Sequence, residues 1–366
     1  MINYCKGCGV ALQTSNPKEI GYVLPTHLHT QRCQRCFKIN QYSEFQKVDI
    51  NNEKLFEMIQ HYNPQKDVIT LVVDLSDLVE TCLFELADML KMHKTIVVVN
   101  KIDIILSDMR HYEIWEDYLQ NLFDKHGIEV AAFFFVSAKE QLGIKRLIRY
   151  FYQLPLHQIR IIGCANVGKS SLIQALFHDS DVPETIMPTI FMTPGTTLEE
   201  LEIQWGAYKI YDTPGIMKPQ QLTYYVKNKD LKEILINKAI KPKNYHIYEP
   251  QTFFIAGYAQ INVYPKDTNT ITFFCANNLP IHRKKITNDD AFFQQHIGEL
   301  LSPPSLINYR ENEQIQKRQL HTMEIKRNKQ DVVISGLGWI SLNKKDVNLE
   351  IITVDGVKVY QQHAIV

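Results

Sequence analysis

The stretch GCANVGKS at residues 163–170 decides the fold, because it fits the pattern G-x-x-x-x-G-K-[ST] of a phosphate-binding loop. In such a loop the glycines let backbone N–H groups surround phosphates, Lys169 reaches the β and γ oxygens, and Ser170 ligates magnesium. Apolar residues 157–162 predict a strand before the loop, and residues 171–177 predict a helix after it. We therefore predict a triphosphate site formed by Gly163, Asn166, Val167, Gly168, Lys169, Ser170 and Ser171.

Two further segments indicate that the base is guanine. The sequence NKID at residues 100–103 follows the apolar run 95–99, and SAK at residues 137–139 follows the predicted strand 131–136. In a GTPase with the first motif, the Asp103 carboxylate would accept from guanine N1 and N2, a donor pair that adenine lacks. The two segments together predict a base site formed by Asn100, Lys101, Asp103, Ser137, Ala138 and Lys139.

Residues of two further loops are expected to contact magnesium and the γ-phosphate. Asp212 ends a predicted strand, where its carboxylate can hold the magnesium shell, and Gly215 can offer its N–H to the γ-phosphate without steric interference. In PGTT at residues 194–197 we favour Thr197 over Thr196 as the switch threonine, although both loops could also be ordinary turns. The predicted catalytic residues are Lys169, Thr197 and Gly215, and the predicted magnesium ligands are Ser170, Thr197 and Asp212.

The residue after Gly215 is Ile216, where Ras-like enzymes have the glutamine that orients the attacking water. We therefore expect slow intrinsic hydrolysis unless a cation, another loop or a partner positions that water. Asn166 resembles the asparagine of GTPases that recruit potassium beside the phosphates. Potassium stimulation is accordingly a hypothesis for this chain.

The order of these motifs predicts a circular permutation, because both base motifs precede the phosphate loop. A doubly wound α/β sheet tolerates permutation when its natural ends lie close together. We predict a permuted P-loop GTPase domain over residues 46–217, with strands at 68–73, 95–99, 131–136, 158–162, 198–204 and 209–211. The γ-phosphate loop then leads directly into residues 218–366, so its movement on hydrolysis would act on that domain.

Four of the seven cysteines form two x2-spaced pairs, Cys5 with Cys8 and Cys33 with Cys36. This spacing is typical of a four-cysteine zinc site, with His27 or His29 as an alternative ligand. We predict a zinc-knuckle domain over residues 1–45. The isolated cysteines are interpreted as packing residues, namely Cys82, Cys164 and Cys275.

Composition limits the class of protein and its location. The chain has 366 residues, 45% of them apolar, which excludes a mainly disordered protein. It has neither a signal peptide nor an apolar run of 18 residues, so we expect a cytoplasmic protein without a membrane partner. Net charge is zero, but residues 218–366 carry 20 Lys and Arg against 14 Asp and Glu, which suits an anionic partner such as RNA and equally an ordinary solvated surface.

The C-terminal residues predict an α+β domain. Apolar segments at 252–256, 260–264 and 270–275 predict antiparallel strands, and residues 288–300 predict a helix. SGLGW at residues 335–339 is interpreted as close backbone packing at a sheet turn. The basic HRKK at residues 282–285 could grip a phosphate backbone or form a solvated loop.

The permuted order, the cysteine pairs, Asn166, Ile216 and the SGLGW segment together resemble the bacterial YqeH family of circularly permuted GTPases, over essentially the whole chain. This resemblance implies GTP or GDP, Mg²⁺ and Zn²⁺ as cofactors, with K⁺ as a further hypothesis. It also implies an RNA- or protein-binding C-terminal domain, and a role in assembly of the small (30S) ribosomal subunit. The implied partners are that subunit or its precursor and ribosomal RNA, and DNA is not expected.

Three hypotheses follow for function. The leading one is a GTP-hydrolysing switch that binds immature small subunits in one nucleotide state and leaves in the other. The alternative is a zinc-containing RNA-binding module in which guanine nucleotide is mainly structural. A metabolic enzyme that uses GTP as phosphoryl donor ranks last, because no acceptor-site or catalytic-base motif is evident.

Overall fold

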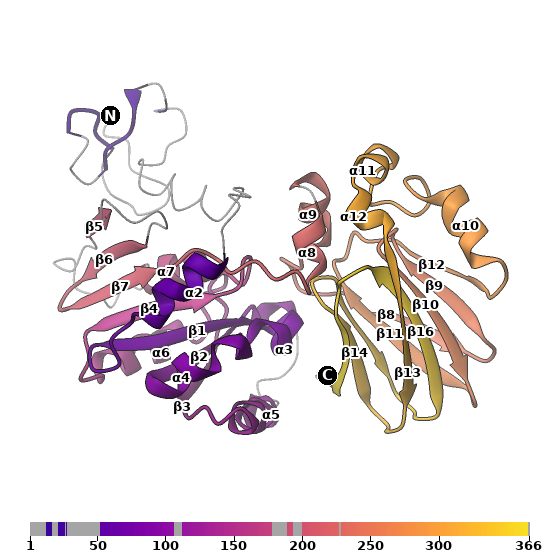
Figure 1. Ribbon diagram of the computed structural model, residues 1–366, viewed down its shortest axis with the longest axis horizontal. Helices are drawn as coiled ribbons and strands as arrows, with labels where there is room; N and C mark the ends of the chain where they lie inside the picture. The colour runs from indigo at the N-terminus through magenta and orange to yellow at the C-terminus, as the bar shows by residue number, and fades with distance from the viewer. Residues whose placement is uncertain are drawn as a thin grey trace. The chain divides into compact units, whose positions relative to one another are not determined.

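The structure is a computed structural model of the chain that describes residues 12–16, 21–25, 27, 52–105, 112–177, 189–192, 200–226 and 228–364. The chain separates into two compact units, one of Met1–Ile102 and Arg110–Met217, the other of Asp103–Met109 and Lys218–Val366 (Figure 1). Among helices in the described ranges, none is long and apolar enough to span a bilayer. Some predicted site residues lie outside these ranges, namely Cys5, Cys8, Cys33, Cys36 and Thr197.

A seven-stranded sheet in the order β3-β2-β1-β4-β7-β6-β5 forms the first unit (Figure 1). Strands β1, β2, β3, β4 and β7 are parallel, whereas β6 is antiparallel to both of its neighbours, β7 and β5. The chain starts at the centre, builds one edge, and returns to the centre with β4, which is the permuted order expected. The bounds are β1 Asp67–Asp74, β2 Lys94–Asn100, β3 Val130–Phe135, β4 Gln158–Gly163, β5 Thr189–Met192, β6 Leu201–Trp205 and β7 Tyr208–Asp212.

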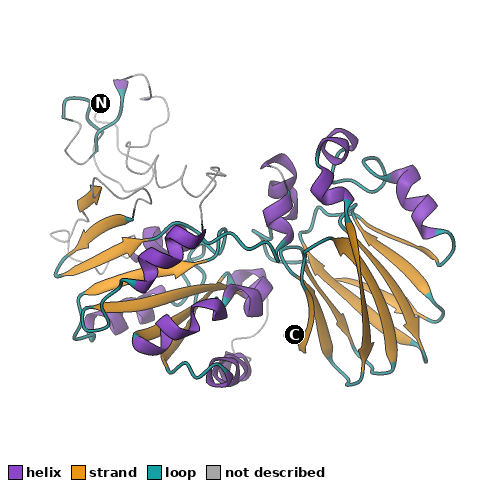
Figure 2. Cartoon of the chain, in the orientation of Figure 1, coloured by secondary structure: helices purple, strands orange, loops and turns teal. Residues whose placement is uncertain are grey.

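Helices accompany this sheet, as a parallel sheet requires when both of its faces are buried (Figure 2). Strand β1 is buried along its whole length, which explains why its sequence DVITLVVD is a nearly continuous apolar run. The helices are α2 Asn52–Gln60, η2 Leu75–Asp77, α3 Leu78–Thr81, η3 Phe84–Leu86, α4 Ala87–Met92, η4 Ile102–Ile104, α5 Tyr112–Lys125, α6 Ile144–Tyr152 and α7 Lys169–Phe177.

One edge of the sheet differs from the prediction. The strand expected at 198–204 is observed as β6, which extends to Trp205, and β5 was not predicted. Trp205 is fully buried and pairs with Tyr208 across a tight turn in which Gly206 has φ +59°. The aromatic residue therefore belongs to a β6–β7 hairpin, and the polar Gln204 before it does not end the strand.

Two five-stranded antiparallel sheets form the second unit, in the orders β12-β9-β10-β16-β13 and β17-β14-β15-β11-β8. They pack face to face, since the Phe253 ring of β9 lies 5.1 Å from both Phe273 of β11 and Tyr245 of β8. The strands are β8 Lys243–Ile247, β9 Gln251–Ile255, β10 Ala259–Pro265, β11 Asn269–Cys275, β12 Ile281–Lys285, β13 Arg318–Ile325, β14 Gln330–Ile334, β15 Gly338–Leu342, β16 Val347–Val354 and β17 Val359–His363. The helices are α8 Leu222–Tyr225, α9 Asn228–Ile234, α10 Asp289–His296, α11 Leu306–Glu311 and α12 Glu313–Gln316.

Strands β9, β10 and β11 match the segments predicted from apolar runs. The helix predicted at 288–300 is shorter, because α10 ends at His296 and Gly298 then adopts φ +83° against Leu306. The SGLGW segment forms the turn between β14 and β15, as interpreted: Gly338 has φ +136°, and a Cβ there would collide with the Phe274 carbonyl.

The basic HRKK segment is not a loop. Its residues lie in β12, an edge strand, where the cations bond within their own unit. The Arg283 guanidinium donates to Gln251 Oε1 at 2.6 Å, and Lys284 pairs with Asp289. The loop interpretation is therefore wrong, because the strand pairing was invisible in so polar a sequence, whereas a contact with a phosphate backbone stays a prediction.

Candidate functional site

The phosphate loop lies where the sequence predicted, between β4 and the start of α7 at Lys169. Asn166 and Gly168 have φ +65° and +94°, so the backbone turns sharply twice within three residues. Such left-handed residues bring successive N–H groups onto one side of a loop, a geometry that binds anions. Glycine is needed at 168, because a Cβ there would collide with the Asn100 side-chain amide.

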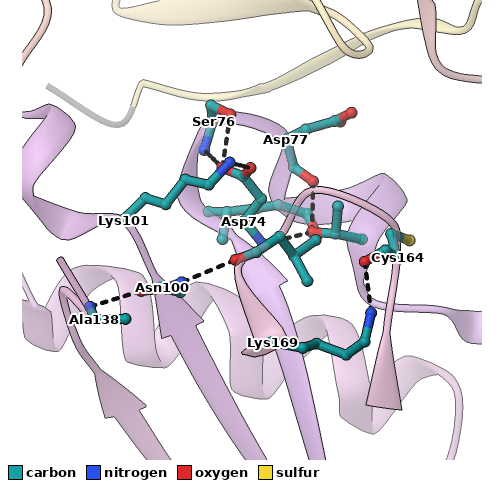
Figure 3. A network of polar contacts seen from close by, with 11 residues as sticks. Asp74, Ser76, Asp77, Asn100, Lys101, Ala138, Cys164 and Lys169 are labelled. Carbon is teal, nitrogen blue, oxygen red and sulfur yellow. Dashed lines mark hydrogen bonds and ion pairs between the residues drawn. The ribbon is translucent and has the colours of Figure 1, made fainter. Parts of the chain in front are cut away.

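Lys169 points its amino group into this loop. Nζ donates to the carbonyl oxygen of Gly163 at 3.0 Å. It also donates to the carbonyl oxygen of Cys164 at 3.1 Å (Figure 3). Burial lowers the pKa of Lys169, whereas the nearby Asp212 carboxylate favours its charged form. A phosphate oxygen in the loop would give this buried cation a charged partner in place of neutral carbonyls.

Ser170 and Asp212 form the neighbouring polar pair. Ser170 Oγ donates to Asp212 Oδ2 at 3.2 Å, and Asp212 Oδ1 is buried without a hydrogen-bond partner among the described residues. Burial raises the pKa of Asp212 to about 6, while Lys169 and the Ser170 hydrogen bond oppose that rise. An orphaned carboxylate oxygen beside a hydroxyl is a donor set that suits Mg²⁺. These residues therefore fit the magnesium ion that GTP chemistry requires.

The segment after β7 continues along the phosphate loop. Ile216 N donates to the Gly163 carbonyl at 3.1 Å, and Ala165 N donates to the Ile216 carbonyl at 2.9 Å. A Cβ on Gly215 would lie 2.8 Å from Ala165 Cα, so only glycine fits this approach. The Ile216 side chain is buried, with 1% of its surface exposed. It is apolar and inward-facing, and thus offers no group that could orient water.

Asn100 connects the two base loops to the phosphate loop. Its buried side chain donates through Nδ2 to the Val167 carbonyl at 2.8 Å and accepts through Oδ1 from Ala138 N at 3.1 Å (Figure 3). Ser137 is also buried and its Oγ accepts from Glu140 N at 3.0 Å, which shapes the second loop. Three segments far apart in sequence therefore meet at one amide group.

Lys101 has an ionic partner that the sequence reasoning missed. Its backbone has φ +67°, and Nζ lies 2.5 Å from Oδ2 of Asp74, the last residue of β1. The available signal was an acidic residue ending a buried apolar strand, at the edge of the sheet where the other motifs gather. The remaining base-site residues differ in setting, since Asp103 lies in η4 and Lys139 is exposed beside Glu140 at 3.1 Å.

Two family models match the chain. One, described as 50S ribosome-binding GTPase, covers residues 158–260 and so begins at the first residue of β4. The other, described as YqeH-like, C-terminal, covers residues 268–365. The NKID and SAK segments both precede the GTPase match, which agrees with the permuted order.

Known proteins resemble the chain over nearly all of its length. "Uncharacterized protein YqeH" of Bacillus subtilis is 30% identical over 99% of this chain and 99% of its own. "NO-associated protein 1, chloroplastic/mitochondrial" of Arabidopsis thaliana is 27% identical over 93% of this chain and 70% of its own. The solved structure of YjeQ from Thermotoga maritima aligns with 44% of this chain and 54% of its own, at 22% identity and a TM-score of 0.26, too low to carry an argument.

Proposed function

Because the chain belongs to the YqeH family of GTPases, we propose that it is a GTP-hydrolysing switch that assists assembly of the small ribosomal subunit. GTP, GDP and Mg²⁺ follow from the GTPase domain itself. The observation that carries the proposal is the meeting of the phosphate loop, Asn100 and Asp212 at one edge of the sheet. A ribosomal partner is supported by the matching GTPase family, which is described as 50S ribosome-binding. The choice of the small subunit rests on the family resemblance.

The proposed reaction is in-line attack of water on the γ-phosphate, which yields GDP and inorganic phosphate. Lys169 and the magnesium ion held by Ser170 and Asp212 would stabilise the charge that develops on the phosphate oxygens. Gly215 would sense the γ-phosphate through its N–H, and Thr197 is the proposed switch ligand. Because Ile216 supplies no polar group, we expect slow turnover in the absence of a partner.

Two cations remain part of the proposal. We propose zinc bound by Cys5, Cys8, Cys33 and Cys36, because their x2 spacing suits a four-thiolate site. The four cysteines lie outside the described residues, so the zinc content of the purified protein is to be measured directly. For potassium, Asn166 is exposed on the phosphate loop. Equal single-turnover rates in potassium and sodium salts would refute the potassium hypothesis.

The buried Ile216 also favours the second candidate, an RNA-binding module in which the nucleotide mainly stabilises the fold. The deciding experiment is sedimentation of the protein with separated 30S and 50S subunits, in GDP and in a non-hydrolysable GTP analogue. Analogue-dependent binding to 30S, lost in Lys169→Ala, is the result expected of the switch. Equal binding in GDP and in the analogue would support the RNA-binding module. Binding to 50S alone would indicate a role in assembly of the large subunit.

A further inference from the structure

We propose that Asp74 is the positioning residue of the base-binding loop: it holds the Lys101 side chain across the carboxyl end of β1, where the aliphatic stem forms one wall for the guanine ring. The proposal rests on the proposed function in one respect, which is that the NKID segment binds the base. It adds a residue outside every motif used to recognise the site.

The Asp74 carboxylate is itself held in place. Its Oδ1 accepts from Ser76 N at 2.8 Å and from Ser76 Oγ at 2.7 Å, so that the side chain caps η2 (Figure 3). Its main-chain N–H donates to Thr81 Oγ1 at 2.9 Å, and that hydroxyl donates to the Asp77 carbonyl at 2.8 Å. With Oδ1 occupied, Oδ2 faces the Lys101 amino group at 2.5 Å. The carboxylate is therefore a fixed point to which the flexible lysine attaches.

Strand order determines where the Lys101 stem lies. Asp74 is paired in register with Asn100 on β2, while Val72 of the same strand is paired with Gly163 on β4. β1 thus lies between the strand that leads to NKID and the strand that leads to the phosphate loop. Open α/β sheets bind ligands at the carboxyl ends of strands where the chain order reverses, and the β1–β4 junction is such a point. A lysine that reaches from the end of β2 to the end of β1 lies beside that crevice.

Fixing Lys101 before the nucleotide arrives has an energetic consequence. An unpaired lysine side chain keeps most of its rotamers and must lose them when a ligand packs against it. The ion pair orders the side chain in advance, and its two side chains are only 18% and 11% exposed. The gain in binding free energy comes from contact with the base, so it is the same for GDP and for GTP. It is therefore uniform binding, which lowers KM and leaves kcat unchanged.

The test is the Asp74→Asn variant, which keeps an oxygen to accept from Ser76 but removes the charge that attracts Lys101. We expect methylanthraniloyl-GDP and the corresponding GTP to bind about tenfold more weakly, the upper cost of immobilising one long side chain on binding, with kcat within about twofold of wild type. Methylanthraniloyl-IDP lacks the 2-amino group that Asp103 would read. It should weaken by the same factor as GDP, since Lys101 contacts the ring face.

A double-mutant cycle with Lys101→Met separates positioning from folding. Lys101→Met alone should weaken binding as Asp74→Asn does, and adding Asp74→Asn to it should change nothing further. The proposal is overturned if Asp74→Asn binds like wild type, if its effect persists in the Lys101→Met background, or if GDP weakens more than IDP. Failure of the wild-type protein to bind methylanthraniloyl-GDP with Mg²⁺ would instead overturn the proposed base site itself.

Discussion

The phosphate loop of the first unit and strand β12 of the second unit both contain lysine, yet they use its charge in opposite ways. Lys169 donates to main-chain carbonyls, and the neighbouring Asp212 Oδ1 has no hydrogen-bond partner among the described residues. In β12, Lys284 pairs with Asp289, and Lys285 lies 3.0 Å from Glu249. Residue type alone therefore does not identify an anion site. Incomplete satisfaction of buried charged groups is the more informative sign.

Strand position explains this difference. The phosphate loop follows the carboxyl end of a central parallel strand, where Asn166 and Gly168 turn the backbone out of strand geometry. β12 is an edge strand, and charged side chains on an edge discourage further strand pairing. The cations of β12 thus have a sufficient structural explanation, whereas Lys169 of the phosphate loop does not.

Of the substitutions that test this comparison, Lys169→Ala should have the largest effect, and that effect is on GTP hydrolysis. Removal of a charge that stabilises the transition state is expected to lower kcat/KM for GTP by at least about 100-fold. Single-turnover hydrolysis with saturating Mg²⁺ measures the loss. Lys285→Ala is the matched lysine control and should hydrolyse GTP like wild type. Retention of hydrolysis in Lys169→Ala would remove the phosphate loop from the mechanism.

Arg160→Met tests a buried charge of the first unit that is fully paired. Its guanidinium lies 2.9 Å from Asp67 and 2.6 Å from Glu200, and it stacks 3.6 Å from the Tyr211 ring centroid. Loss of the cation leaves two carboxylates without their ionic partner, so we expect a destabilisation of about 3–5 kcal/mol. Urea unfolding measures this destabilisation, in the transition whose urea midpoint rises when GDP is added. A change below about 1 kcal/mol would show that the network is dispensable.

Asp212→Asn should separate stability from function. Because the folded pKa is raised from 3.8 to about 6, wild-type Asp212 favours folding only while protonated, and this contribution is lost as pH rises through 6. The variant should therefore stabilise the nucleotide-free protein by about 3 kcal/mol at pH 8, and by progressively less toward pH 4.

The same substitution should weaken Mg²⁺-dependent GTP binding, because an amide nitrogen replaces one carboxylate oxygen and the negative charge is lost. Urea midpoints across pH and nucleotide titrations with and without Mg²⁺ provide both readouts. A variant that is less stable than wild type at pH 8 would contradict the cost assigned to this buried carboxylate.

The first unit could be predicted from sequence because its signals are local. Apolar runs marked β1 and β2, and the phosphate-loop pattern gave the start of α7 to within two residues. Asp74 could not be assigned, because its role depends on a lysine 27 residues away that only the strand order brings close. The bridging role of Asn100 was hidden for the same reason, since its partner Val167 is 67 residues distant.

The second unit was less predictable because its pairing is long-range. β10 pairs with β16 so that Asn262 lies opposite Glu350, a register that no turn chemistry or motif in the sequence specifies. Polar edge strands such as β12 and β13 lack the alternation that marks a strand facing a core. Zinc binding by the four cysteines and the switch role of Thr197 stay predictions.

Lys285→Ala should have the smallest effect, and that result would sharpen the comparison. The side chain is 77% exposed and paired with an exposed Glu249, so its loss should change stability by less than about 0.5 kcal/mol. If β12 serves the sheet alone, the affinity for ribosomal RNA should also be unchanged, and the slope of log K against log salt should equal that of wild type. A lysine that contacts phosphate would lower this slope by about one. That outcome would assign β12 to an RNA surface despite its internal pairing, and would show that a satisfied cation can still serve an anionic partner.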